Sequence, residues 1–273
     1  MSDGLGKIHD VAEELGRSAG AIASLTVLGA ERQVPAHVHA NPYLSLHVLG
    51  DYRERDDGGE AFIGGPAAMF FPAGSAHDMT IGPQGLATVI IEFDAGRLHE
   101  TVGPAATGVR RWIGGEVGRR ASRLARTWLS GAAADRRFAM TEAFLRSALH
   151  AGPHRPPPRW LEELDAWISE TGGAPRTDRL ARQCGVSRHW LARAYREWRG
   201  EGLGQALRRR RVAAAAILLE SPQWRLADIA AEMGFCDQSH MNRAFKRLLG
   251  RTPDAIRAAR LGLAAPHGRQ HRA

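Results

Sequence analysis

The feature that most constrains the fold is an internal repeat in the C-terminal half of the chain. Two segments share one residue order: an apolar residue followed by alanine, then a glycine, then two apolar residues four positions apart. These residues are Leu180-Ala181, Gly185, Leu191 and Tyr195 in the first segment, and Ile229-Ala230, Gly234, Met241 and Phe245 in the second. Glycine adopts the positive φ that ends a helix without steric strain. Each segment is therefore predicted to be two short helices joined by a tight turn.

The second helix of each segment is expected to bury its apolar residues and to turn a polar side outward. That side carries Arg188, His189, Ala192, Arg193 and Arg196 in the first unit, and Gln238, Ser239, Asn242, Arg243 and Lys246 in the second. Most of these side chains can hydrogen-bond base edges, and an exposed helix fits the major groove of DNA.

A helix predicted over Gly204 to Glu220 joins the two units. Its apolar side carries residues such as Leu207 and Val212, and its other side is predicted to carry the run from Arg208 to Arg211. At about 1.5 Å per residue this helix spans roughly 25 Å. That length could hold the two units near one duplex turn apart, about 34 Å.

Charge is distributed unevenly between the two halves of the chain. Residues 1–150 hold 15 Lys and Arg against 17 Asp and Glu, a net charge of −2, whereas residues 151–273 hold 22 against 12, a net charge of +10. A basic half attracts phosphates, although a solvated basic face with no ligand has the same composition. The repeat is what favours a nucleic-acid partner.

The C-terminal half resembles the AraC/XylS family of bacterial regulators between about Arg176 and Arg257. The resemblance rests on Ile229-Ala230, Met233-Gly234-Phe235, Asp237-Gln238-Ser239, the run from Arg243 to Arg247, Gly250, Thr252-Pro253 and Ile256-Arg257. It implies an all-α domain with two helix-turn-helix units, at about 176–199 and 225–249, joined by a long helix. Thr177 stands where the family usually has leucine, and Ile256 where it usually has tyrosine.

The resemblance also implies roles for individual residues. Base-edge contacts are expected from His189 and Arg193 in the first unit. In the second unit they are expected from Gln238, Ser239, Asn242 and Arg243. By the same comparison, Arg188 and Lys246 are expected to contact phosphates.

The N-terminal half is predicted to be a small β-barrel or sandwich. Four β-type runs stand at Ala21–Leu28, Leu44–Leu49, Ala67–Phe71 and Ala87–Phe93, with turn-rich stretches between them. Many short strands without intervening helices favour such a fold. From about Trp112 to Leu149 the pattern becomes helical, with a break near Gly131. The apolar side formed by Leu124, Trp128 and Leu129 either packs on the barrel or forms a dimer interface.

Three histidines give the N-terminal half a candidate site. His37 and His39 lie two residues apart just before a predicted strand, and His77 follows Pro72-Ala-Gly74. This spacing resembles the two cupin motifs between about Gly29 and Phe93. The resemblance implies a barrel whose interior receives these side chains, and the cupin carboxylate position holds Tyr43 instead. Three interpretations stay open: a polar effector pocket lined by His37, His39, Tyr43 and His77, a metal site, or hydrogen bonding within the barrel. The first is favoured, with no metal and no cofactor.

The predicted fold class is therefore α+β with two domains. Residues 1–110 form a cupin-like sensor domain, 111–150 a helical segment with a candidate dimerisation face, 151–159 a proline-rich linker and 160–260 the DNA-binding domain. Three successive prolines, Pro156 to Pro158, favour a stiff extended linker.

The predicted function is a sequence-specific transcription regulator, not an enzyme, that binds double-stranded DNA and responds to a small-molecule effector. A homodimer and contact with RNA polymerase are further expected partners. The chain has no apolar run that could cross a membrane and no signal-peptide pattern, so it is expected in the cytoplasm. Two alternatives are a metal-dependent cupin enzyme with secondary DNA binding and a non-specific architectural DNA binder.

Overall fold

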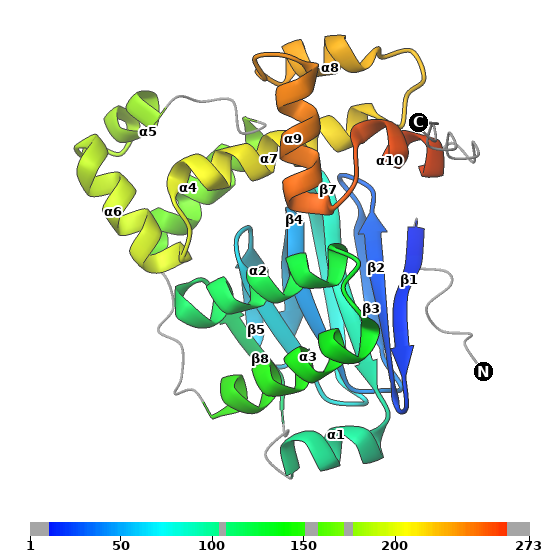
Figure 1. Ribbon diagram of the computed structural model, residues 1–273. Helices are drawn as coiled ribbons and strands as arrows, with labels where there is room; N and C mark the ends of the chain where they lie inside the picture. Colours follow the sequence, from blue (N-terminus) through cyan, green and yellow to red (C-terminus); the bar gives the residue numbers. More distant parts are fainter. Residues whose placement is uncertain (1–10, 104–107, 151–157, 172–176, 261–273) are drawn as a thin grey trace, which may run out of the picture.

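The computed structural model describes residues 11–103, 108–150, 158–171 and 177–260. Within these ranges the N-terminal half is a curled antiparallel sheet, and the C-terminal half is a set of helices at one end of it (Figure 1). The α+β class with a sheet followed by paired helices is confirmed. No helix in the described ranges combines the length and the apolar character needed to cross a membrane.

The sheet is organised around two long strands. Its strands are β1 (Val11–Ser18), β2 (Ala21–Leu28), β3 (Gln33–Val38), β4 (Tyr43–Asp56), β5 (Gly59–Ile63), β6 (Ala67–Phe71), β7 (Ala76–Phe93) and β8 (Arg110–Ile113). The main order is β1-β2-β7-β4-β6-β8, while β3 also pairs with β7 and β5 with β4. Since β4 and β7 each pair with three strands, the sheet curls around an apolar interior.

Three helices cover the N-terminal sheet. They are α1 (Ala95–Val102), α2 (Gly115–Leu129) and α3 (Ala134–Leu149), of which α2 and α3 cross one face (Figure 1). The predicted helix start near Trp112 is wrong, because this residue lies in β8 and pairs with Ala68 of β6. Leu124 and Trp128 are buried in the core shared with the sheet, so of the two alternatives left open this apolar side packs on the barrel.

Seven helices make up the described C-terminal half. They are α4 (Arg159–Glu170), α5 (Thr177–Gln183), α6 (Arg188–Arg199), α7 (Leu203–Leu218), α8 (Leu226–Glu232), α9 (Gln238–Leu249) and α10 (Pro253–Arg260). Helices α5 and α6 form the first predicted unit, α8 and α9 form the second, and α7 joins them. Most of the predicted linker, residues 151–157, lies outside the described residues.

The two halves share one core and a set of buried charges. Val212 of α7 and Phe245 of α9 belong to the same apolar cluster as Leu46 of β4. Arg209 and Arg210 are only 5% and 0% exposed, so the prediction that the whole arginine run lies on one polar side is wrong. Four consecutive helical residues point in directions about 100° apart, so they cannot share a side.

Buried polar contacts join α7 and α4 to the sheet. Arg210 Nη1 donates to Asp51 Oδ2 at 3.0 Å, and Arg209 Nη2 donates to the carbonyl oxygen of Gly64 at 2.8 Å. Gln84 Nε2 donates to the carbonyl oxygen of Ser169 at 2.8 Å. Breaking a buried ion pair of this kind leaves an uncompensated charge, which costs about 3–5 kcal/mol. The helical half is therefore held firmly against the sheet.

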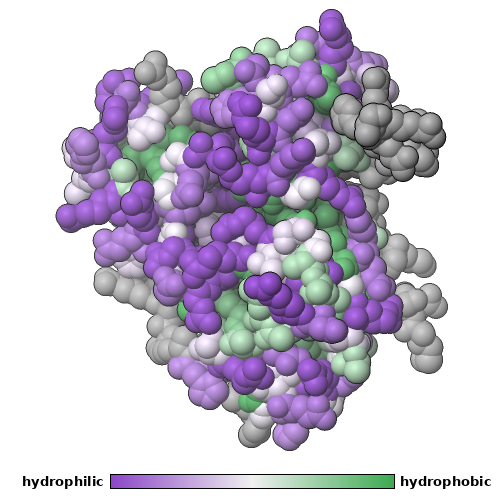
Figure 2. Space-filling model, in the orientation of Figure 1, coloured by the Kyte–Doolittle hydropathy of each residue, from purple (hydrophilic) through white to green (hydrophobic). Residues whose placement is uncertain are grey.

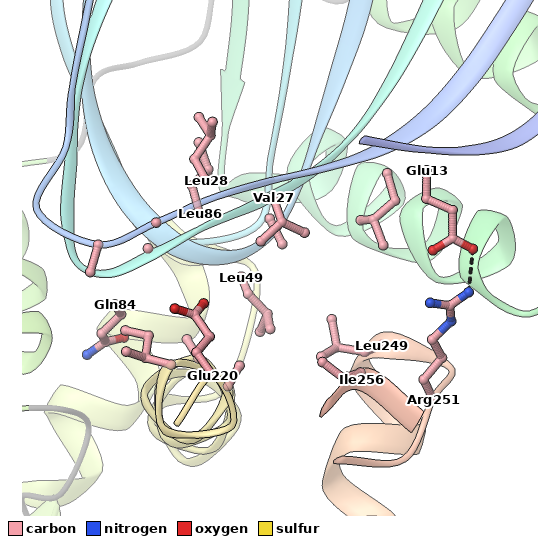
Figure 3. A pocket seen from close by; sticks show the side chains of 18 residues that line it. Glu13, Val27, Leu28, Leu49, Gln84, Leu86, Glu220, Leu249, Arg251 and Ile256 are labelled. Atoms are coloured by element: carbon pink, nitrogen blue, oxygen red, sulfur yellow. Dashed lines mark hydrogen bonds and ion pairs between the residues drawn. The ribbon is translucent and has the colours of Figure 1, made fainter. Parts of the chain in front are cut away.

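One part of this interface is not filled. An apolar cavity of about 110 Å³ lies between β2, β4 and β7 on one side and α7, α9 and α10 on the other. Figure 3 shows Leu249 and Ile256 facing Val27 and Leu49 across it, and an ion pair between Arg251 and Glu13 at one side. Figure 2 shows hydrophobic residues gathered near the boundary between helices and sheet, under a surface that is otherwise mostly hydrophilic.

Candidate nucleic-acid interface and histidine cluster

The sequence repeat reappears in the backbone hydrogen bonds of the two helical units. Val186 N donates to Ala181 O at 3.0 Å, and Phe235 N donates to Ala230 O at 2.9 Å in the second unit. Gly185 and Gly234 have φ of 65° and 69°, the left-handed conformation that ends the first helix of each unit. Equivalent residues of the two units are 49 positions apart before the turn and 50 after it, because the second unit has one extra residue, Cys236, just after the turn.

The second helix of each unit, here called a recognition helix, begins at a side-chain cap. Ser187 caps α6 by accepting from Trp190 N at 3.2 Å, and Asp237 caps α9 by accepting from His240 N at 2.5 Å. Such caps satisfy amide groups that have no partner within the helix and contribute about 1 kcal/mol each. The caps fix where each exposed face starts.

The recognition helices bury one face and leave the predicted contact face open. Leu191 and Tyr195 of α6 and Met241 and Phe245 of α9 are all 0% exposed. Seven of the eight predicted DNA contacts are exposed and Asn242 is half-buried; the exposed ones are Arg188, His189, Arg193, Gln238, Ser239, Arg243 and Lys246. Of these eight residues, only Arg188 has a side-chain partner within the described part of the chain, an exposed ion pair with Asp178 at 2.9 Å.

A groove connects the open faces of the two units. It has a volume of about 600 Å³ and is lined by Arg188, His189 and Arg196 of α6, by Arg208 and Arg211 of α7, and by His240 of α9. The groove is rich in cationic side chains, with Asp178 the one acidic residue among those that line it. Side chains of α6, of α7 and of the start of α9 therefore face one shared groove.

Both recognition helices end against helix α2 of the N-terminal half. They end at Gly200 and Gly250, each with φ of 70°. A Cβ on Gly200 would lie 2.5 Å from the carbonyl oxygen of Gly115, at the start of α2. A Cβ on Gly250 would collide with the carbonyl oxygen of Leu129, at the end of α2. The repeated glycine of the two units thus permits close docking at the two ends of one helix.

The three barrel histidines meet at their Nε2 atoms. The separations are 3.1 Å between His37 and His39, 3.1 Å between His37 and His77, and 3.4 Å between His39 and His77. His77 Nδ1 faces Glu54 Oε1 at 2.9 Å, and His37 Nδ1 faces the carbonyl oxygen of Pro35 at 3.0 Å. A histidine that donates from Nδ1 keeps an unshared electron pair on Nε2, which is how metal-binding histidines are commonly oriented.

This geometry fits a transition-metal ion. With metal–nitrogen bonds of about 2.1 Å, nitrogen atoms 3.1–3.4 Å apart subtend roughly 95–110° at the metal, between octahedral and tetrahedral angles. Burial lowers the pKa of His37, which favours the neutral, ligating form. The cavity beside the histidines is only about 30 Å³, room for one water or ion rather than for an organic molecule.

Tyr43 contacts the histidine cluster from its buried side. Its hydroxyl lies 3.2 Å from His77 Nε2, and burial raises its pKa well above 10, so the phenol stays protonated and can donate. The structure thus brings together all four residues predicted for an effector pocket. His47, by contrast, takes no part in the cluster, and its Nε2 lies 3.0 Å from the carbonyl oxygen of Gly50.

Sequence reasoning missed four functional candidates. Glu54 reaches His77 only because residues 43–56 and 76–93 pair as neighbouring strands, a long-range register that no local pattern reveals. Arg208 and Arg211 were visible as part of a basic run, but which of the four arginines face outward depends on how α7 packs. His240 was not predicted, because it belongs to no apolar pattern in the sequence.

Comparison with known proteins assigns the chain to a family. The Helix-turn-helix domain model matches residues 180–259. The regulatory protein SoxS of Escherichia coli strain K12 is 34% identical over 98 residues, which are 36% of this chain and 92% of SoxS. The probable transcription factor PqrA of Proteus vulgaris is 33% identical over 97 residues, 36% of this chain and 79% of PqrA.

Among solved structures, ToxT of Vibrio cholerae O395 aligns with 86% of this chain and 96% of its own, at a TM-score of 0.37 and 10% identity. The sequence match to SoxS, which spans nearly the whole of that regulator, carries the assignment. The chain belongs to the AraC/XylS family and is a DNA-binding transcription regulator.

Proposed function

We propose that α6 and α9 read the base sequence of adjacent major-groove segments on one face of a duplex. The observation that carries this proposal is the shared cationic groove, onto which the open face of α6 and the start of α9 both look. Arg193 and Arg243 occupy equivalent positions in the two units, are exposed, and bond to no other described residue. An arginine that is free in this way can bind a guanine edge with two hydrogen bonds.

Binding-site selection from genomic fragments, followed by affinity measurements on the selected and a scrambled duplex, tests this assignment. Arg193→Ala and Arg243→Ala should each lose about 1–3 kcal/mol of discrimination between the two duplexes. Lys246→Ala should weaken binding to both duplexes equally and lower the salt dependence by about one phosphate contact. Arg146→Ala, an exposed arginine of α3, is the control and should change neither. Unchanged discrimination in both Arg193→Ala and Arg243→Ala would refute the assignment.

We further propose that the barrel binds one divalent transition-metal ion through His37, His39 and His77. Three converging Nε2 atoms and the orienting contact from Glu54 support this, and it replaces the expectation of a metal-free effector pocket. Such an ion would connect β3 to β7 and so stabilise the barrel when bound. The small space beside the histidines favours a structural or sensing ion over a catalytic one, which needs room for a substrate.

Metal content after loading with Co²⁺ or Zn²⁺ and desalting tests the ion site. The parent should retain about one ion per chain, with a Co²⁺ absorption typical of nitrogen ligands. His77→Ala should lose it, and Glu54→Gln should bind about 10–100-fold more weakly, whereas His99→Ala on α1 should match the parent. Sub-stoichiometric metal in the parent would refute the site and leave DNA binding untouched. An effector response, a homodimer and contact with RNA polymerase stay predictions from the sequence.

A further inference from the structure

A second cavity between the sheet and the helices differs from the apolar one in Figure 3 by being cationic. It measures about 300 Å³ and lies where β4, α2, α7 and α9 meet. Its polar lining includes four arginines, Arg126 of α2, Arg208 and Arg209 of α7 and Arg247 of α9. Glu201 is the one acidic residue that lines it.

The charges in this cavity are not balanced by the protein. Glu201 forms an ion pair with Arg209 at 2.6 Å, and both are largely buried. Arg126 donates only to the hydroxyl of Ser122, at 2.9 Å, and burial lowers its pKa. In the described part of the chain neither Arg208 nor Arg247 has a hydrogen bond or an ion pair. Three guanidinium groups therefore share the cavity without an ion pair of their own, and Glu201, which acts on Arg126 from a distance, is already paired with Arg209.

Neighbouring groups do not reduce this excess of positive charge. His47 on β4 lines the cavity, and burial, followed by the charge of Arg209, lowers its pKa to about 3, so it is neutral. Arg209 keeps two buried nitrogens, Nε and Nη1, that have no hydrogen-bond partner. Like charges held close together repel, and a bound anion would relieve that repulsion.

We propose that this cavity binds a compact small molecule carrying at least two carboxylate or phosphate groups. Guanidinium groups bind both kinds of oxyanion through paired hydrogen bonds, and three of them can engage two such groups at once. A volume of about 300 Å³ lies at the small end of ligand sites, and a DNA duplex cannot enter it. The small molecule, not nucleic acid, is therefore the expected occupant.

The position of the cavity connects this ligand to DNA binding. Arg126 belongs to the N-terminal half, whereas Arg247 lies on a recognition helix next to Lys246, a predicted phosphate contact. Arg208 lines both this cavity and the DNA-facing groove. A ligand that engages Arg208 withdraws positive charge from the groove, so ligand and DNA are expected to weaken each other's binding by the same factor.

Calorimetric titration of the full chain at fixed ionic strength tests the site directly. The probes are citrate for carboxylates, fructose 1,6-bisphosphate for phosphates, and fructose as a neutral control. We expect saturable one-to-one binding of at least one of the two anions and none of fructose. Arg126→Gln and Arg247→Gln should each weaken binding at least tenfold. Arg123→Gln, the exposed neighbour on α2 that does not line the cavity, should stay within twofold.

Three outcomes overturn the proposal. The first is the absence of saturable binding for both anions, and the second is equal affinity in Arg126→Gln and Arg123→Gln. The third comes from DNA titrations with and without the anion: an equal effect in the parent and in Arg126→Gln would mean ionic competition at the DNA surface. Since Arg126 is exposed and joined only to Ser122, its glutamine variant should fold, which matching circular dichroism melts check.

Discussion

Replacing Gly250 with alanine tests whether the second recognition helix is docked on α2. Gly250 ends α9 in the left-handed conformation, and an alanine Cβ there would meet the carbonyl group at the end of α2. Gly234 ends α8 with nearly the same φ, 69° against 70°, yet a Cβ on it would meet nothing within 4 Å. The two variants therefore share the backbone penalty and differ in the collision.

The expected magnitudes follow from that difference. A left-handed conformation costs an alanine about 1–2 kcal/mol, which is the whole expected effect of Gly234→Ala. Forcing atoms into a packed contact adds about 1–3 kcal/mol, so Gly250→Ala should cost roughly 2–5 kcal/mol in total. Urea unfolding followed by circular dichroism measures both values. Equal losses, within about 0.5 kcal/mol, would refute the docked arrangement, because the collision exists only if α9 rests on α2.

Three further predictions concern buried and capping groups. Asp165→Asn should cost about 3–5 kcal/mol in urea unfolding, because Arg199, paired with it at 2.6 Å, would stay buried with no counter-charge; a loss under 1 kcal/mol would contradict this. Between pH 7.5 and 5 the parent should lose about 2 kcal/mol through His47, whose imidazole takes up a proton below its ordinary pKa of 6.5 only when unfolded. His47→Gln should remove that part of the slope, and an unchanged pH profile would refute the argument. Asp237→Ala should cost about 1 kcal/mol of stability by removing the cap of α9, and exchange of the His240 backbone amide hydrogen should accelerate. An unchanged exchange rate at that amide would contradict the capping role.

Prediction from sequence succeeded where local rules decide the structure. The repeated glycines and the four-residue apolar spacing fixed both helical units, since a tight turn between two helices leaves few alternatives. β2 and β6 were predicted with their observed ends, because both are short apolar runs bounded by turns. The predicted contact residues are exposed for the same reason: a helix that buries one face must show the other.

The missed elements depend on distant parts of the chain. β3 contains Pro35, which argues against a strand, but β3 pairs only with β7, and proline is tolerated at such an edge. β8 begins with two arginines and is a strand only because β6 offers an open edge. The burial of Arg210 likewise depends on Asp51, a residue 159 positions earlier in the chain. No local pattern carries that information.

The docking of both recognition helices on α2 has a consequence for how such a regulator can change over evolution. The fifteen residues of α2 span about 22 Å, so the ends of the two recognition helices rest on two points about that far apart on one helix of the N-terminal half. Lengthening or shortening α2 by one turn would move one of these two contact points by about 5.4 Å relative to the other. A helical half grafted onto a foreign barrel would therefore need a helix of matching length to make both of these contacts.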